Sequence, residues 1–75
     1  MKLEITYCGP RNHLPRAASL AAEINKATGV EATLIKGDGG TFDVVLDGSL
    51  IFSRKQAGRF PEAAEVLEKI SGRVS

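Results

Sequence analysis

The sequence predicts an α/β fold: a two-layer α+β sandwich of order β-α-β-β-β-α, whose four-stranded mixed sheet carries both helices on one face. The chain has 75 residues, 43% of them hydrophobic and 25% charged, which fits a single globular domain spanning residues 1–75. Four short segments alternate apolar and polar residues, whereas two longer segments repeat apolar residues at helical spacing. Most apolar residues of the strands share one face, so the helices are expected to cover that face alone.

The first two elements are a strand and a helix. Residues 2–7 alternate polar and apolar side chains, which predicts a half-buried strand. Residues 8–13 break this pattern. Pro15 then suits the first turn of a helix, and Gly29 ends that helix after Thr28. The apolar face of the helix consists of Leu14, Ala17, Ala18, Ala21 and Ile24.

Three strands and a second helix follow. The strands are expected at residues 30–36, 41–46 and 49–53. The first β-α-β unit should be parallel with a right-handed crossover. The last two strands form an antiparallel hairpin, because Asp47 and Gly48 both accept the positive φ of a two-residue turn. Pro61 opens the last helix, whose apolar stripe consists of Ala63, Val66, Leu67 and Ile70.

The two faces of the predicted sheet differ in polarity. The face under the helices is expected to hold the apolar residues Leu3, Ile5, Tyr7, Val30, Ala32, Leu34, Phe42, Val44, Leu46, Leu50 and Phe52. The opposite face is polar apart from Ile35, Val45 and Ile51. That asymmetry is typical of a sheet that is packed on one side and open to solvent on the other.

Composition and charge exclude several classes of function. The 10 basic and 9 acidic residues leave a formal charge of +1, too small an excess for sequence-independent binding of nucleic acid. The longest apolar-leaning stretch, residues 17–24, is too short to cross a bilayer, so no membrane partner is expected. The first residues lack the features of a secretory signal, and one cysteine cannot form an intramolecular disulfide. We therefore expect a cytoplasmic protein.

The topology predicts that three separate segments meet at one edge of the sheet, which we call the Cys8 end. Because the first two strands are parallel, Cys8 and Gly37 lie at the same edge, and the third and fourth strands begin and finish there. Cys8, residues 37–41 and residues 53–55 should therefore converge. Ligand sites favour the carboxyl ends of parallel strands.

Cys8 is the candidate reactive group, and two interpretations of it remain open. A helix N-terminus and nearby cations stabilise a thiolate, and Arg11, His13 and Arg16 are close in sequence. That interpretation requires a sulfur atom that solvent can reach. Alternatively, Cys8 is a buried small hydrophobic residue.

The other polar motifs at this end indicate no cofactor. His13 has no second histidine or cysteine at ligand spacing, so we expect no metal site and a surface histidine. Residues 37–40 (Gly-Asp-Gly-Gly) lack the helix and the Lys-Ser/Thr pair of a phosphate loop. They fit a turn whose backbone a ligand can approach closely.

Five segments in order resemble the selenoprotein W-like redox (Rdx) family, the selenoprotein W/T/H group. They are Tyr7-Cys8-Gly9-Pro10-Arg11, Asn12-His13-Leu14-Pro15-Arg16-Ala17, Gly39-Gly40-Thr41-Phe42-Asp43-Val44, Asp47-Gly48-Ser49-Leu50-Ile51-Phe52-Ser53-Arg54-Lys55 and Gly58-Arg59-Phe60-Pro61-Glu62. The first occupies the place of the family's Cys-x-x-Cys or Cys-x-x-selenocysteine motif. The resemblance covers nearly the whole chain and implies a thioredoxin-like fold.

The resemblance implies thiol-redox chemistry at Cys8, with Gly9, Pro10 and Arg11 completing the motif. Arg11 replaces the second redox residue, so the chain is a degenerate Cys-x-x-Arg member. A dithiol enzyme resolves its mixed disulfide with the second thiol, which this chain lacks. Cys8 is then a monothiol whose mixed disulfide with glutathione or a protein thiol is resolved externally, and Arg11 stabilises its thiolate.

The resemblance also implies a substrate site on the neighbouring loops. Gly40 and Thr41 would offer their backbone to the substrate, although the cis-proline usual in thioredoxin-like folds is absent. Arg54 and Lys55 are the cations expected to bind a carboxylate, for example that of glutathione as co-substrate. The role of sensor, carrier or turnover enzyme remains open. The alternative is a redox-inactive interaction module that binds a partner through the Cys8 end or through the open face at Ile35, Val45 and Ile51.

Overall fold

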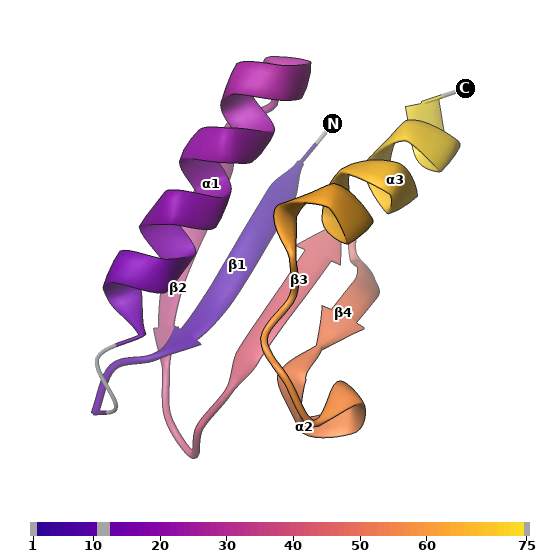
Figure 1. Ribbon diagram of the computed structural model, residues 1–75. Helices are drawn as coiled ribbons and strands as arrows, with labels where there is room; N and C mark the ends of the chain where they lie inside the picture. Colours follow the sequence, from indigo (N-terminus) through magenta and orange to yellow (C-terminus); the bar gives the residue numbers. More distant parts are fainter. Residues whose placement is uncertain (1, 11–12, 75) are drawn as a thin grey trace.

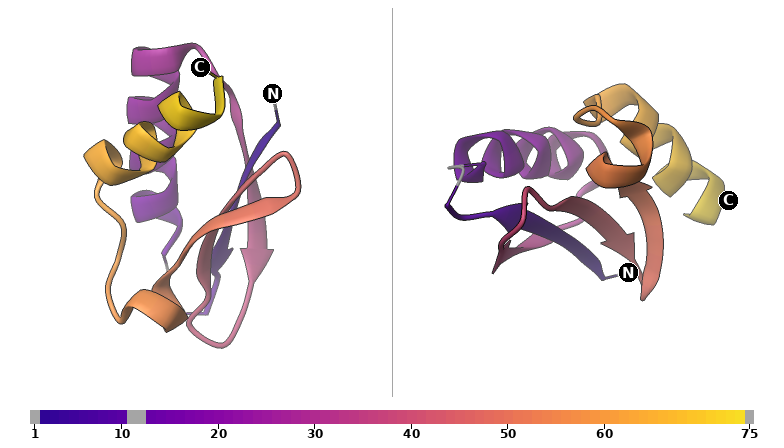
Figure 2. Two further views of the ribbon diagram at one scale, coloured as in Figure 1. Left: turned by 90° about the vertical axis from the view of Figure 1, so that its right-hand side faces the viewer. Right: turned by 90° about the horizontal axis from the view of Figure 1, so that it is seen from below.

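The computed structural model describes residues 2–10 and 13–74, with side chains as far as residue 72. Its elements, in chain order, are β1 (Leu3–Cys8), α1 (Leu14–Thr28), β2 (Ala32–Gly37), β3 (Phe42–Leu46), β4 (Ser49–Ser53), α2 (Arg54–Ala57) and α3 (Ala63–Val74). The strands form one sheet in the order β2-β1-β3-β4 (Figure 1). Figure 2 shows α1 and α3 together on one face of that sheet. The predicted two-layer mixed sandwich is confirmed.

The strand register brings four strand ends to one edge. β1 runs parallel to β2, with Cys8 opposite Gly37. It runs antiparallel to β3, with Tyr7 opposite Phe42, and β3 pairs antiparallel with β4. The carboxyl ends of β1, β2 and β4 and the start of β3 therefore lie at the Cys8 end, which is the lower edge in Figure 1. This convergence is as predicted.

Local sequence signals set the bounds of α1. Pro15 lies in its first turn, where a missing N–H leaves no hydrogen bond unmade. At the other end, Gly29 adopts φ 76° and its N–H donates to the carbonyl of Asn25. Thr28 donates its hydroxyl to the carbonyl of Ile24 at 2.7 Å and accepts the N–H of Val30. The helix therefore spans the predicted residues.

The core lies between the sheet and the two long helices. Its buried members are Leu3, Ile5, Ala17, Leu20, Ile24, Phe42, Val44, Leu46, Ile51, Phe52, Val66 and Ile70. They come from every strand except β2, whose Ala32 and Leu34 pack at the margin half-buried. A single apolar layer of this kind stabilises a small sheet that is open on its other face.

The predicted facing of β4 is wrong at Leu50 and Ile51. A β-bulge between Val44 and Val45 shifts the register, so Val45 pairs with Leu50 and Val44 with Phe52. Two consecutive residues of β4 therefore point inward. Leu50 is 48% exposed, and Ile51, expected on the open face, is only 9% exposed.

The segment after β4 also differs from the prediction. The short helix α2 was not predicted, and it ends at Gly58 with φ 75°, where the Gly58 N–H donates to the carbonyl of Arg54. α3 begins at Ala63 rather than at Pro61, and β2 begins at Ala32 rather than at Val30. From α3, Lys69 Nζ donates to the carbonyl of Ile51 on the edge strand β4 at 2.6 Å. Of the described helices, none has the length and apolar content needed to span a membrane.

Candidate functional site

Backbone hydrogen bonds fix the turn that follows β1. The Gly9 N–H donates to the Gly37 carbonyl at 3.1 Å, so the chain leaves β1 while still attached to the end of β2. The His13 N–H donates to the Cys8 carbonyl at 3.1 Å, and α1 begins at the next residue. Cys8 therefore lies where the first strand passes to its helix, as expected.

The Cys8 sulfur is buried. The residue is 1% exposed, and Sγ accepts a hydrogen bond from the Gly40 N–H at 3.3 Å. The expectation of a solvent-reachable sulfur is therefore wrong, because the backbone of the loop before β3 packs against it. The same contact gives the sulfur a fixed donor, and such a donor stabilises a negative charge.

Two glycines shape the loop that supplies this donor. Gly39 and Gly40 have φ of 67° and 77°, the left-handed region in which other residues are strained. Thr41 anchors the loop, since both its N–H and its hydroxyl donate to the Asp38 carbonyl, at 3.3 and 2.7 Å. The sequence thus provides a tight turn whose Gly40 N–H faces the sulfur.

Arg54 holds the other side of this loop. Its Nη1 donates to the Gly40 carbonyl at 3.3 Å, so Cys8, Gly40 and Arg54 are linked by two hydrogen bonds. Its Nε is buried without a hydrogen-bond partner among the described residues. Of the predicted substrate-binding residues, Gly40 contacts the candidate thiol directly, and Arg54 is linked to it through Gly40.

An aromatic cluster supports the arginines. Phe60 packs edge-on against Phe42 and His13, with ring centroids 5.4 and 4.9 Å away. Arg16 and Arg54 lie over the Phe60 ring, with Cζ 4.0 and 4.8 Å from its centroid. His13 was expected at the surface but is half-buried in this cluster. The role of Phe60 was missed, although its place in the last resembling motif was a signal.

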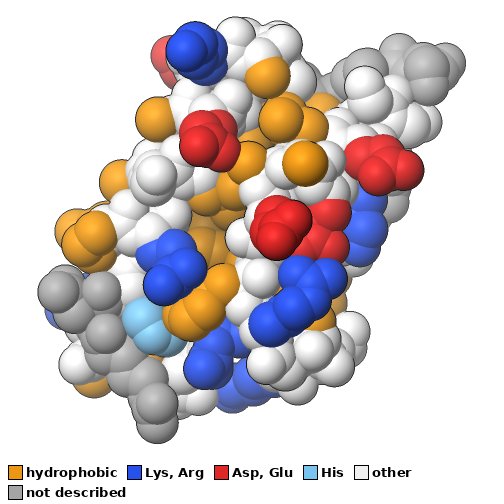
Figure 3. Space-filling model, in the orientation of Figure 1, with side chains coloured by type: hydrophobic (Ala, Val, Ile, Leu, Met, Phe, Trp, Pro, Cys, Tyr) orange, Lys and Arg blue, Asp and Glu red, His pale blue; other side chains and the backbone are white. Residues whose placement is uncertain are grey.

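Two lysines complete the basic surface at this end. The aliphatic chain of Lys36 covers Gly9. A Cβ built on Gly9 would lie 3.0 Å from Lys36 Cγ and 3.2 Å from Lys36 Cδ. Lys55 Nζ lies 3.5 Å from the position that a Cβ of Gly39 would occupy. We call Arg16, Lys36, Arg54 and Lys55 the cation cluster. Figure 3 shows blue side chains gathered near the pale-blue histidine.

A fifth cation, Arg59, is neutralised by a carboxylate. Its guanidinium binds both oxygens of Glu65, with Nη2 to Oε2 at 2.9 Å, and the Glu62 N–H donates to Glu65 Oε1 at 2.8 Å. The hydrogen bond from Arg59, followed by that from the Glu62 backbone, lowers the pKa of Glu65 to about 2. The same pairing raises the pKa of Arg59. Arg59 is thus set apart from the cation cluster.

The remaining predicted residues stand as follows. Gly9 and Pro10 form the turn after β1, and Thr41 anchors the glycine loop without contacting the sulfur by a hydrogen bond. Arg11 lies outside the described residues, so its predicted role beside the thiolate stays a prediction. The described part of the chain contains no group of three or more side chains suited to hold a metal ion.

Comparison with known proteins identifies the family. The sequence profile of the Rdx family matches residues 2–72. The structure of a selenoprotein W-related protein from Vibrio cholerae superposes with a TM-score of 0.93 at 31% identity, covering 99% of this chain and 96% of that one. A structure from Bordetella parapertussis gives a TM-score of 0.92 at 31% identity, covering 96% and 95%. No curated sequence shows significant similarity.

The fold is thus thioredoxin-like, as the sequence predicted. Family membership points to a redox-related role. The chain belongs to the Rdx family.

Proposed function

We propose that this protein is a thiol-redox protein that uses Cys8 as its single reactive thiol. The observation that carries the proposal is the hydrogen bond from the Gly40 N–H to Sγ at 3.3 Å, with the Gly40 peptide held in turn by Arg54. A fixed backbone donor stabilises the thiolate, which is the nucleophilic form of cysteine. The position of Cys8 at the end of the first strand supports the same role.

The proposed reaction is thiol–disulfide exchange. The Cys8 thiolate attacks one sulfur of a glutathione or protein disulfide, the partner's S–S bond breaks, and a new S–S bond to Cys8 forms. The departing thiolate takes a proton from water, so Cys8 is oxidised while one partner sulfur is reduced. The chain has no second cysteine, so an external thiol resolves the mixed disulfide.

The burial of Cys8 means that the exchange proceeds from a locally opened state. The sulfur is covered in the closed structure, and its hydrogen bond to Gly40 must break before a disulfide can approach. Local opening of loops requires less free energy than global unfolding. The two glycines at positive φ provide a segment in which such a change meets little steric resistance.

The same burial favours a second candidate function, a redox-inactive module that binds a partner through its surface. In that case Cys8 is a core residue and the open face of the sheet is the natural surface. Its exposed apolar residues are Ile35 and Leu50, at 37% and 48%, rather than the predicted Ile51. Single exposed apolar residues of this kind are common on any protein, so we rank this function second.

Exchange with glutathione disulfide tests the two functions. The folded protein and the same protein in concentrated denaturant are incubated with this reagent at pH 7, and the adduct is followed by mass spectrometry. We expect folded Cys8 to form the mixed disulfide, with Cys8→Ser as the control that forms none. Adduct formation in denaturant but none in the folded protein over the same hours would contradict the redox proposal and support the interaction module.

A further inference from the structure

The tip of the loop that covers Cys8 is tied to other segments through a single residue, Gly40. Among the described hydrogen bonds, the Gly40 N–H donates to Cys8 Sγ, and the Gly40 carbonyl accepts from Arg54 Nη1, both at 3.3 Å. Gly40 is itself buried. Access to the sulfur therefore depends on whether these two hydrogen bonds hold.

The two hydrogen bonds differ in strength. A cysteine sulfur is a weak acceptor, whereas a guanidinium donates a charge-assisted hydrogen bond to a carbonyl oxygen. The loop's own backbone offers little resistance to a rearrangement, because Gly39 and Gly40 both have positive φ, which glycine adopts without strain. Arg54 is therefore the stronger of the two ties that keep the loop closed over the sulfur.

Arg54 is positioned for this contact from its own side. It is the first residue of α2, directly after β4, and its Cζ lies 4.8 Å from the centroid of the Phe60 ring. A guanidinium that is packed on an aromatic ring loses little further conformational entropy when it bonds to Gly40. Arg16 lies over the same ring at 4.0 Å but forms no described hydrogen bond with the loop, so the two arginines make a matched pair.

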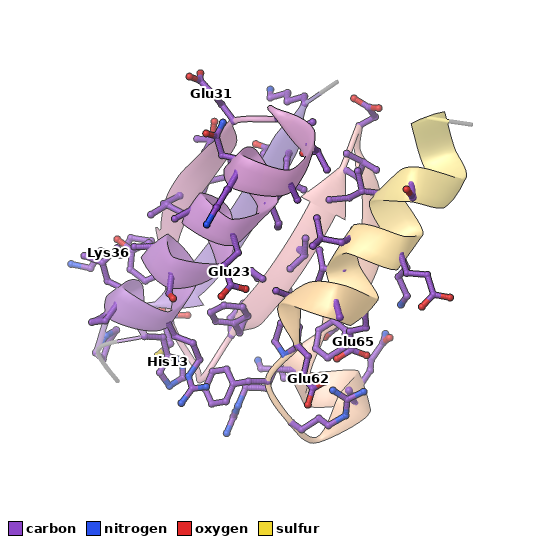
Figure 4. All side chains as sticks on the ribbon, turned by 45° about the horizontal axis from the view of Figure 1, so that its top comes forward. His13, Glu23, Glu31, Lys36, Glu62 and Glu65 are labelled. Atoms are coloured by element: carbon purple, nitrogen blue, oxygen red, sulfur yellow. The ribbon has the colours of Figure 1, made fainter. Side chains whose placement is uncertain are left out.

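No carboxylate among the described residues draws Arg54 away from Gly40. Figure 4 shows where four glutamates lie: at the far end of the sheet, part-way along α1, and at the start of α3 (Glu31, Glu23, and Glu62 with Glu65). Asp43 is nearer, since its partner across the sheet is Ser53, the residue before Arg54. The one ion pair in the described part of the chain, however, joins Arg59 to Glu65.

The closed state leaves one donor of Arg54 unsatisfied. Nε is buried without a hydrogen-bond partner among the described residues. A buried donor without a partner destabilises the state that contains it, and it gains a hydrogen bond to water when the side chain moves out. That gain offsets part of the bond lost to Gly40, so the contact can be released without a large cost in free energy.

We propose that Arg54 is a latch on the loop. While it holds the Gly40 carbonyl, the loop covers the sulfur, and when it releases the carbonyl, the loop opens and admits a disulfide to Cys8. This inference rests on the proposed thiol exchange and identifies what controls access to the same sulfur. It predicts that the loss of Arg54 speeds up the reaction of Cys8, whereas the loss of a residue that binds the substrate would slow it.

Two arginine variants on the same ring test the latch in the full chain. Arg54→Met keeps an unbranched side chain beside Phe60 and removes the donor to Gly40, and Arg16→Met is the matched control. Cys8 is alkylated with iodoacetamide, a small uncharged reagent, and the adduct is followed by mass spectrometry. We expect Arg54→Met to react about tenfold faster than the wild type, the effect of one charge-assisted hydrogen bond on opening, and Arg16→Met to stay within about twofold.

Hydrogen exchange of the Gly40 N–H measures the opening itself and does not depend on the ionisation of the thiol. By NMR, this exchange in Arg54→Met should rise by about the same tenfold, while the amides of the central strand β1 keep their wild-type rates. An equal rise in β1 would mean a general loss of stability and would overturn the latch.

The alkylation rates decide the inference in the same way. A rate in Arg54→Met that is equal to the wild-type rate or lower would contradict the latch, and so would an equal gain in Arg16→Met. A final arm uses bis(2-hydroxyethyl) disulfide, which is also uncharged. If alkylation is faster in Arg54→Met but neither protein forms the mixed disulfide, the latch stands and the thiol-redox function fails.

Discussion

The two ends of the sheet treat their polar groups in opposite ways. At the end away from Cys8, the hairpin turn at Asp47 and Gly48 is closed by the chain itself. The Lys2 N–H donates to Asp47 Oδ1 at 2.7 Å, and the Asp47 N–H donates to the Lys2 carbonyl at 2.8 Å. Helix α1 ends nearby with its own hydroxyl and glycine caps. Every one of these bonds joins two parts of the same molecule.

At the Cys8 end, by contrast, polar groups are left over. Arg54 Nη1 donates a hydrogen bond to the Gly40 carbonyl, but Arg54 Nε has no partner among the described residues. The cation cluster has no carboxylate partners among them either. A buried polar group without a partner destabilises a small domain unless a ligand or solvent supplies the missing hydrogen bond. One end therefore closes its polar groups within the fold, whereas the other leaves cationic groups without carboxylate partners among the described residues.

The largest effect is expected from breaking the support of the Cys8 end with Phe42→Ala. Phe42 is fully buried and packs against Phe60, which carries the two arginines. Removing its ring leaves a cavity and should lower the free energy of unfolding by about 3–5 kcal/mol. Urea unfolding followed by circular dichroism measures the loss. Phe42→Leu, which leaves a smaller cavity, should remain folded, and a loss below about 1 kcal/mol for Phe42→Ala would contradict this role.

A smaller effect is expected at the opposite end from Asp47→Ala. The substitution removes the acceptor for the Lys2 N–H and places a residue other than glycine, asparagine or aspartate at φ 51°. The free energy of unfolding should fall by about 1–2 kcal/mol, whereas Asp47→Asn should change it little. Neither variant should alter the rate of disulfide exchange at Cys8. A parallel change in that rate would show that the two ends are coupled.

The smallest effect concerns the neutralised cation, Arg59, and its carboxylate. The pKa of Glu65 is about 2 in the folded protein, below its ordinary value of 4.5. The pair therefore contributes stability above about pH 4.5 and loses it as the pH falls toward 2. Glu65→Gln should lower the Tm at pH 7 by less than about 4 °C, because exposed ion pairs contribute little.

The pH dependence checks the origin of that effect. The Tm difference between the wild type and Glu65→Gln should shrink between pH 4.5 and about 2. Glu68→Gln on the same helix, an exposed residue, serves as the control and should show no such trend. A difference in Tm that stays constant through this range of pH would mean that the ion pair is not its cause.

Most of the fold follows from signals within short stretches of sequence. Pro15 and Gly29 mark the ends of α1, and Asp47 with Gly48 marks the hairpin, because each acts on the local backbone. The parallel and antiparallel pairing then follows from topology, which is why the convergence at the Cys8 end was predicted. The bulge at Val44 and Val45 was not, since it depends on how two strands fit together.

The details of the site depended on contacts between segments that are distant in sequence. Gly40 and Cys8 are 32 residues apart, and the burial of the sulfur results from their packing. Arg16 from α1 and Arg54 from α2 both lie over the ring of Phe60. The spacing of apolar residues along the sequence does not indicate this arrangement. Residue types and the edge at which they meet were therefore predictable, but exposure and stacking were not.

The bulge and Lys69 together bear on how this protein behaves at high concentration. β4 is an outer strand of the sheet, and an outer strand with free backbone groups is a template for pairing between molecules and hence for aggregation. Here the ammonium group of Lys69 donates a hydrogen bond to the carbonyl of Ile51 at 2.6 Å. The bulge opposite Val44 and Val45 also disturbs the regular hydrogen-bond spacing of the strand. A second molecule would have to displace that lysine before it could add a strand, which protects the exposed Leu50 edge from intermolecular association.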